Sequence, residues 1–139
     1  MRSLVGEPLF PALVRRKRAA RDIILLYRQN NGLSPVANDP LLQKAAQSQA
    51  NAMAQVGRLD HNAGGSFEGR IAAVGRGPCY AVENVSAGYH TFDAAFSGWR
   101  RSVPHNRNLL DPHAARMGIA TAYAPDAKYK VYWALIMTD

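Results

Sequence analysis

The sequence contains a single cysteine, Cys79, among its 139 residues. No internal disulfide can form, so the fold must depend on a hydrophobic core, and a chain of this length can build one. The lack of disulfides does not exclude an oxidising compartment, because a domain of this size does not need them. We expect Cys79 to be a half-buried small side chain, with a reactive free thiol or an intermolecular partner as the alternatives.

Long apolar runs are also absent, and none approaches the roughly 18–20 residues that a membrane-spanning helix needs. The mildly apolar stretch 4–14 is interrupted by Glu7, Pro8 and Pro11, and the basic cluster 15–18 follows it. In a signal peptide the basic residues precede the apolar stretch. The sequence therefore predicts no transmembrane segment and an extended lead-in over residues 1–14. It leaves open a cytoplasmic protein or a mature form whose signal peptide has been removed.

Acidic residues are few: ten Asp and Glu stand against seventeen Lys and Arg, which gives a net charge of +7 and a pI of about 10. Such a balance allows attraction to nucleic acid, anionic lipid headgroups or acidic glycans. Outside the cluster 15–18 the basic residues are scattered, without the interleaved aromatics that a base-stacking surface uses. This pattern disfavours nucleic acid and leaves an anionic surface as a candidate partner.

Hydrophobic periodicity predicts two helices in the first half of a globular domain, over about 14–29 and 40–56. Asp39 has the N-cap position of the second helix, and Pro40 the first helical position. Side chains that recur at helical spacing should face the core; they are Ile23, Leu26 and Tyr27 in the first helix and Leu42, Ala46, Ala50, Met53 and Val56 in the second.

The second half of the chain predicts a short helix at 67–74, a short strand at 83–85, and a helix that Thr91 caps and Pro104 limits. Residues 117–123 and 129–138 are rich in β-branched and aromatic side chains and predict an antiparallel hairpin. Helices followed by strands indicate an α+β fold. The residues expected to be most buried are Leu42, Met53, Phe96, Trp99, Val131 and Trp133.

Two histidines and a glutamate lie in distinctive short sequence motifs: His61, Glu83 and His105. Two imidazoles and a carboxylate from separate segments form a plausible set of ligands for a zinc-like divalent ion. Glu83 could ligate the ion directly or orient an imidazole from behind it. The alternative for His61 is structural, because it follows a helix C-terminus, where a cationic imidazole interacts well with the helix dipole.

Short motifs along residues 20–139 resemble those of the CAP domain, the fold of cysteine-rich secretory, antigen 5 and pathogenesis-related class 1 proteins, in its cysteine-poor bacterial branch. They occur in the family's order. The matching pieces are Gly32-Leu33-Ser34-Pro35-Val36, Asp39-Pro40-Leu41-Leu42, His61, Glu83-Asn84-Val85, Trp99, Ser102, His105-Asn106-Arg107-Asn108-Leu109-Leu110, Gly118 and Tyr132-Trp133. The resemblance implies a single three-layer α-β-α sandwich with a small, mainly antiparallel sheet over residues 15–139. It also implies an extracellular or periplasmic protein.

The family's cleft carries two histidines and two acidic residues, and metal binding has been associated with it. His61, Glu83 and His105 match three of the four positions. At the fourth position this sequence has Ser102 in place of an acid, and Asn84 is expected to form part of the cleft wall through a hydrogen bond to backbone.

The sequence leaves both an enzyme and a binding module open, and it favours the binding module. No H-E-x-x-H helix and no G-x-S-x-G elbow is present. The binding module would take a divalent metal or a small ligand such as a lipid, sterol or glycan, and the exposed aromatics Tyr80 and Tyr89 could contribute. The alternatives are a metal-dependent hydrolase in the same cleft and a scaffold that acts on an envelope or host surface component.

Overall fold

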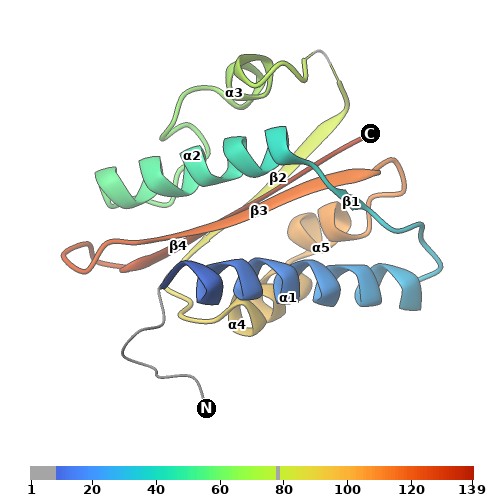
Figure 1. Cartoon of the computed structure of the whole chain (residues 1–139), viewed down its shortest axis with the longest axis horizontal. Coiled ribbons are helices and arrows are strands. Elements are labelled where there is room, and N and C mark those ends of the chain that lie inside the picture. Colours follow the sequence, from blue (N-terminus) through green and yellow to red (C-terminus); the bar gives the residue numbers. More distant parts are fainter. Residues whose placement is uncertain (1–8, 78) are drawn as a thin grey trace.

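The computed structural model describes residues 9–77 and 79–139, with side chains described from residue 19 onward. Within this part of the chain a four-stranded sheet lies between two layers of helices (Figure 1). In chain order the elements are α1 (Leu9–Asn30), β1 (Ala37–Asn38), α2 (Pro40–Val56), α3 (Phe67–Ala73), β2 (Ala81–Ala87), α4 (Phe92–Arg101), α5 (Val103–Leu109), β3 (Arg116–Tyr123) and β4 (Val131–Thr138).

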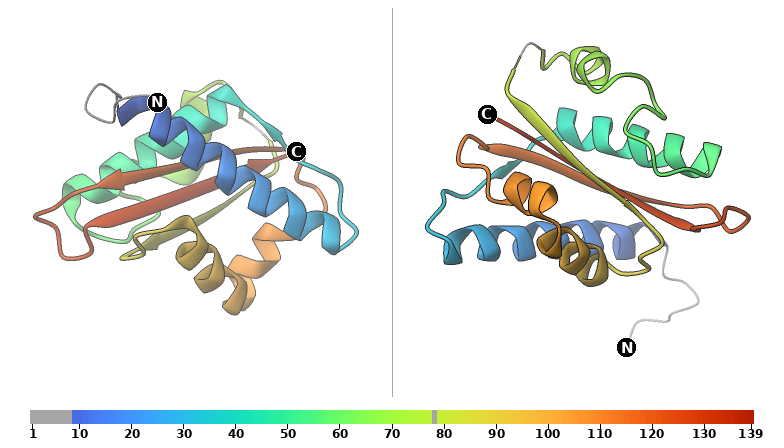
Figure 2. Two further views of the ribbon diagram at one scale, coloured as in Figure 1. Left: turned by 60° about the horizontal axis from the view of Figure 1, so that its bottom comes forward. Right: turned by 180° about the vertical axis from the view of Figure 1, so that it is seen from behind.

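The strand order in the sheet is β1-β3-β4-β2. β4 pairs antiparallel with both β3 and β2, and the short β1 pairs parallel with β3. Helices α2 and α3 cover one face, and α1, α4 and α5 cover the other (Figures 1 and 2). The predicted α+β three-layer sandwich with a mainly antiparallel sheet is confirmed.

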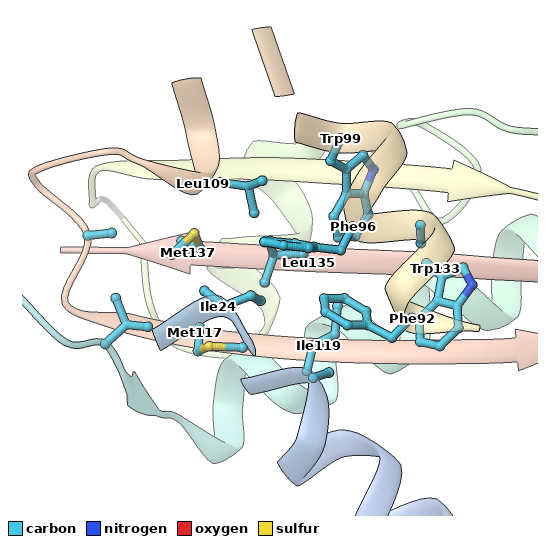
Figure 3. Close-up of a cluster of buried hydrophobic side chains, with 14 of the residues drawn as sticks. Ile24, Phe92, Phe96, Trp99, Leu109, Met117, Ile119, Trp133, Leu135 and Met137 are labelled. Atoms are coloured by element: carbon cyan, nitrogen blue, oxygen red, sulfur yellow. The ribbon is translucent and has the colours of Figure 1, made fainter. Parts of the chain in front are cut away.

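Strand β4 separates two hydrophobic cores. Its residues Val131, Trp133, Leu135 and Met137 face α1 and α4, where Phe92, Phe96 and Trp99 meet them (Figure 3). The alternate residues Tyr132, Ala134 and Ile136 face α2. All eight residues of β4 are buried as a result. The six residues predicted to be most buried are all in these two cores.

The predicted helix caps are present. The Oδ1 atom of Asp39 accepts hydrogen bonds from the backbone N–H groups of Leu41 (2.8 Å) and Leu42 (3.3 Å). The Thr91 hydroxyl accepts from the N–H of Ala94 at 3.2 Å. Each cap satisfies helical N–H groups that have no partner within the helix. These polar residues therefore fix where α2 and α4 begin.

The first helix differs from its prediction at both its start and its buried face. It begins at Leu9, so residues 9–14 are helical where an extended lead-in was expected, and residues 1–8 lie outside the described part. Leu26, expected in the core, is 58% exposed. Within residues 19–30, where side chains are described, the most deeply buried are Ala20, Ile24 and Arg28, spaced four positions apart.

Arg28 explains this orientation of α1. Its guanidinium is fully buried and donates to backbone carbonyl oxygens of the α1–β1 connection, of the end of α5 and of the α5–β3 connection. These hydrogen bonds stabilise the buried charge. The acceptors are Ser34 (3.1 Å), Leu109 (3.0 Å), Asp111 (2.9 Å) and Ala114 (3.4 Å). A basic residue thus takes a core position that apolar periodicity alone would give to leucine.

One further prediction needs correction, and one helix was not predicted. Val56, expected in the core, is 45% exposed at the end of α2. The helix that Thr91 caps ends at Arg101, as the position of Pro104 predicted, but an unpredicted helix, α5, begins at Val103 with the proline in its first turn. Proline is tolerated there, since the first N–H groups of a helix need no intrahelical acceptor.

Helix α2 lies directly against β3, and side chains from α2 pair with that strand's backbone. The amide of Gln43 donates to the carbonyl of Ile119 (2.6 Å) and accepts from its N–H (3.1 Å). Gln47 donates to the carbonyl of Thr121 at 3.0 Å. β1 pairs with β3 only at Arg116 and Met117, so these glutamines continue the hydrogen bonding where β1 ends.

Gly118 is the point of closest approach between α2 and β3. A Cβ atom at this position would lie 2.3 Å from the carbonyl carbon of Leu42 and 2.4 Å from the amide nitrogen of Gln43, both of which belong to the backbone. Backbone atoms cannot move aside as a flexible side chain can. We therefore expect Gly118→Ala to lower the free energy of unfolding by about 3 kcal/mol or more.

Urea denaturation followed by circular dichroism measures this effect. Gly32→Ala is the matched control, because Gly32 has a positive φ of 75° but no atom near its missing Cβ. Backbone strain at this positive φ should lower the free energy of unfolding of Gly32→Ala by about 1 kcal/mol. Equal losses in the two variants would contradict the proposed backbone contact.

Candidate functional site

Polar side chains gather at β2, the outer strand on one side of the sheet. Successive residues of a strand point to opposite faces. Glu83 accordingly contacts the α2–α3 region, and Asn84 contacts α5 on the other face. Residues from both helical layers can therefore meet at this edge. We name His61, Arg70, Glu83, Ser102 and His105 the histidine site.

The centre of the histidine site is the carboxylate of Glu83, whose side chain is 2% exposed. Arg70 of α3 donates to both carboxylate oxygens, from Nη1 to Oε2 and from Nη2 to Oε1, each at 2.8 Å. The Nδ1 atom of His61 lies 2.8 Å from Oε1. A buried carboxylate is stable only when it is paired and hydrogen-bonded, and Arg70 supplies most of that stabilisation.

Arg70 also fixes the segment that carries His61. Its Nη2 atom donates to the carbonyl of His61 at 2.8 Å, and its Nε atom to the carbonyl of Gly65 at 3.3 Å. The guanidinium lies over the Phe67 ring, 5.2 Å from its centroid. Sequence reasoning missed this residue. One argument could have indicated a residue of this kind, because a glutamate buried in a cleft requires a cationic partner.

His105 lies within α5, not after a helix as the sequence suggested. Its Nδ1 atom shares a hydrogen bond of 2.8 Å with the hydroxyl of Ser102, the residue between α4 and α5. Asn84 donates from Nδ2 to the carbonyl of His105 at 3.0 Å and accepts from Asn108 at 2.9 Å. The expected backbone hydrogen bond of Asn84 is therefore present, and it ties α5 to β2.

Side chains also close the outer edge of β2. The Nδ2 atom of Asn108 donates to the carbonyl of Glu83 at 3.3 Å. The indole of Trp99 donates to the carbonyl of Val85 at 3.2 Å, which agrees with the interpretation of this tryptophan as a core anchor. The backbone beside the histidine site is thus held from α4 and α5.

The two histidines of the site have opposite electrostatic environments. The hydrogen bond to Glu83 raises the pKa of His61 above its usual value, against the opposing effect of partial burial. Burial lowers the pKa of His105, and the charge of nearby His61 lowers it further. Near neutral pH, His105 therefore favours the neutral imidazole, while His61 holds its proton to higher pH than a free histidine.

The structure does not leave Glu83 free to act as a direct metal ligand beside His61 and His105. Both oxygens of Glu83 are already hydrogen-bonded, and across residues 9–77 and 79–139 no three His, Cys, Asp or Glu side chains are grouped as metal ligands. Glu83 is placed behind His61, where it holds the ring and leaves Nε2 as the donor atom. His105 likewise has its Nδ1 atom engaged with Ser102 and offers Nε2.

The Ser102–His105 pair does not complete a nucleophile–base–orienter triad. In the described part of the chain, the hydrogen bond of His105 goes to Ser102, and the nearest carboxylate of the site, Glu83, is committed to Arg70 and His61. The base in such a triad is oriented by a third group on its other nitrogen. No such group contacts His105 among the described hydrogen bonds.

The remaining aromatic and thiol predictions have mixed outcomes. Tyr80 is 44% exposed, donates to Asp111 and packs on the ring of His113. Tyr89, expected to be exposed, instead packs against the core, and its carbonyl accepts from the indole of Trp133. Cys79 is half-buried as predicted, with a free thiol.

Cys79 lines a cavity of about 580 Å³ between α3 and the start of β2. Apolar side chains form most of its wall, and the exposed Glu68 lies at its border. Asp60, an acid close to His61 in the sequence, pairs with Arg58 at 3.7 Å and accepts from the N–H of Asn62. Neither acid hydrogen-bonds the histidine site.

Comparison with known proteins identifies relatives of this fold and sequence. The model of the CAP, or cysteine-rich secretory protein, family matches residues 22–137. The uncharacterized protein YkwD of Bacillus subtilis (strain 168) is 28% identical over 95 residues, which make up 66% of this chain and 37% of YkwD. The chain thus spans little more than a third of that relative.

Solved structures show the same fold. An outer surface protein from Borrelia burgdorferi has a TM-score of 0.82 at 16% identity, covering 90% of this chain and 92% of its own. An extracellular protein containing a SCP domain from Bacillus anthracis has a TM-score of 0.81 at 19% identity, covering 99% of this chain and 45% of its own. At these identities the likeness concerns the fold.

The central role of Arg70 can be tested by Arg70→Met, which keeps an apolar stem but leaves the buried Glu83 without its cation. We expect the free energy of unfolding to fall by about 3–5 kcal/mol, because breaking a buried ion pair leaves an uncompensated charge. Arg58→Met is the control, since Arg58 forms an exposed pair worth under about 1 kcal/mol. Chemical denaturation at neutral pH measures both. Similar small losses in the free energy of unfolding of the two variants would show that Arg70 does not stabilise Glu83.

The opposite pKa shifts predict separate histidine titrations. In NMR spectra of the ring protons, the midpoint of His61 should lie above that of a free histidine, near 6.5, and the midpoint of His105 below it. The substitution His61→Ala should raise the midpoint of His105 part of the way back toward that of a free histidine. The charge of His61 is one of the two causes that lower the pKa of His105.

The shift of His61 has a consequence for stability. Because its pKa is raised in the folded state, its contribution is fully present below about pH 6.5 and is lost as the pH rises through the folded value. The stability difference between the wild type and His61→Ala should therefore shrink from mildly acidic to alkaline pH. A difference that grows with pH would contradict the assigned hydrogen bond.

Proposed function

The chain belongs to the cysteine-rich secretory protein (CAP) family, and on that premise we propose that it is an extracytoplasmic, non-catalytic binding module that acts through the histidine site. The observation that carries this proposal is the state of Glu83. Arg70 and His61 together use both of its oxygens. A carboxylate held in this way positions an imidazole and does not act as a free general base.

The ligand of the histidine site is, in this proposal, a zinc-like divalent cation held by the Nε2 atoms of His61 and His105. Glu83 and Ser102 fix the two rings through Nδ1. When bound, such an ion offers its remaining positions to water or to an oxygen of a small ligand such as a lipid, sterol or glycan. Arg70 keeps the carboxylate and the His61 segment in place.

An extracellular or periplasmic location is supported by the relatives. One solved structure is described as an outer surface protein and another as an extracellular protein. Of the helices in the described part of the chain, none has the length and apolarity to cross a bilayer. A small ligand or a component of the envelope or of a host surface fits this location as the partner.

Zinc titration of two double variants tests the proposal. The chain has four histidines, so His61→Ala/His105→Ala can be compared with His90→Ala/His113→Ala, which removes two exposed imidazoles outside the site. We expect calorimetry to show one zinc per wild-type chain and per control chain. The site variant should bind at least about a hundred-fold more weakly, because direct ligands matter more than their supporting residues.

The pH dependence gives a second readout. Zinc must displace the proton from His61, whose pKa is raised, so affinity should increase from mildly acidic to mildly alkaline pH with proton release. Equal zinc binding by the two double variants, or a stoichiometry of zero in the wild type, would contradict the site.

The second candidate function is a metal-dependent hydrolase, which the hydrogen bond between Ser102 and His105 favours. It predicts turnover of peptides or esters that Ser102→Ala or His105→Ala abolishes in folded protein. Turnover lost in both variants would establish the enzyme and overturn the binding module. We expect no turnover above that of the buffer.

A further inference from the structure

The positive charge of the chain is concentrated in one of the two helical layers. Helices α1, α4 and α5 contain nine of the seventeen Lys and Arg residues and two of the ten Asp and Glu residues. Helices α2 and α3, on the opposite face of the sheet, contain two basic residues and one acid. The layer with the excess of basic residues, of which Arg28 is buried, and the nearly neutral layer lie on opposite faces of the sheet (Figure 2).

The described side chains of the basic layer include charges that reach solvent. Arg100, Arg101 and Arg107 are exposed. The guanidinium of Arg100 lies over the rings of Tyr27 and Phe96, at 5.7 and 5.1 Å from their centroids, so its charge is held beside α1. This arrangement joins α4 to α1 in a common surface.

Exposed apolar side chains accompany these charges. Leu26 of α1 is 58% exposed and Val103 of α5 is 71% exposed. Basic residues mixed with exposed aliphatic side chains match the boundary between lipid headgroups and acyl chains. Among the described side chains the exposed aromatics are Tyr80, Tyr123 and Tyr129, and none of them lies on α1, α4 or α5. The described part of the basic layer therefore does not offer the exposed stacking residues that single-stranded nucleic acid uses.

We propose that the layer formed by α1, α4 and α5 docks on an anionic lipid bilayer. The driving force is attraction between the exposed Arg100, Arg101 and Arg107 and lipid phosphates. Leu26 and Val103 add apolar contact. On α5, Arg107 follows His105 by two positions, which places the two on nearly opposite sides of the helix. Docking through the arginine therefore leaves the histidine site open. This inference does not depend on metal binding.

Two charge variants on opposite layers test the docking face. Arg101→Gln/Arg107→Gln removes two exposed charges from the basic layer, and Lys44→Gln/Arg58→Gln removes two from exposed positions at α2 and just after it. Binding to phosphatidylcholine vesicles with and without phosphatidylglycerol is measured by co-sedimentation of the full chain. Circular dichroism verifies that each variant is folded.

We expect the wild type to bind the vesicles that contain phosphatidylglycerol, and to release them as salt is added. The basic-layer variant should bind about thirty-fold more weakly, since each basic residue at an anionic surface contributes about a factor of five. The α2 variant should change by less than about threefold, because its charges face away from the bilayer.

Several outcomes would overturn the proposal. Equal weakening of the two variants would mean that net charge acts without a docking face. Binding to pure phosphatidylcholine as tight as to the anionic vesicles would remove the electrostatic basis. Tighter binding to the soluble polyanion heparin than to the anionic vesicles would assign the face to an acidic polymer.

Discussion

The burial of β4 on both faces is the constraint on which the rest of the structure depends. A strand that is hydrophobic at every position but its last, Thr138, is stable only between two covering layers, and the two helical layers supply them. Polar chemistry is then excluded from the centre of the sheet. The outer strand β2 is where a carboxylate and an amide from neighbouring positions, Glu83 and Asn84, can each reach a different layer.

The histidine site follows from how the charge of Glu83 is satisfied. One arginine from α3 neutralises the carboxylate and also holds the loop that presents His61. The same carboxylate then favours the protonated form of one imidazole, whereas burial favours the neutral form of the other. Two chemically identical side chains thus acquire different properties through their neighbours.

Much of the fold could be predicted from local chemistry. Asp39 and Thr91 have the side chains and positions of N-caps, and the residues of β4 alternate between two faces, so the helix starts and the hairpin followed from the sequence. The order of the motifs indicated the family, which the family comparison supports. His61 and Glu83, two of the predicted site residues, lie in contact, and their role as a site stays a prediction.

What could not be predicted depends on approaches between distant segments. Arg70 lies thirteen residues from Glu83, and nothing local indicates that it pairs there. The burial of Arg28 depends on carbonyl groups roughly eighty residues away, which rotates Leu26 into solvent. Helix α5 was missed because Pro104 was interpreted as a stop, although proline is also compatible with a first turn.

On both sides of the sheet, side chains bond backbone groups that lack a partner strand. Gln43 and Gln47 bond the backbone of β3 beyond β1, and Asn108 and Trp99 bond carbonyl groups of β2. An open strand edge is a template on which strands from other molecules can grow into aggregates. In this chain several edge carbonyl groups that could start such growth already accept hydrogen bonds from its own side chains, which disfavours the addition of a foreign strand at those positions.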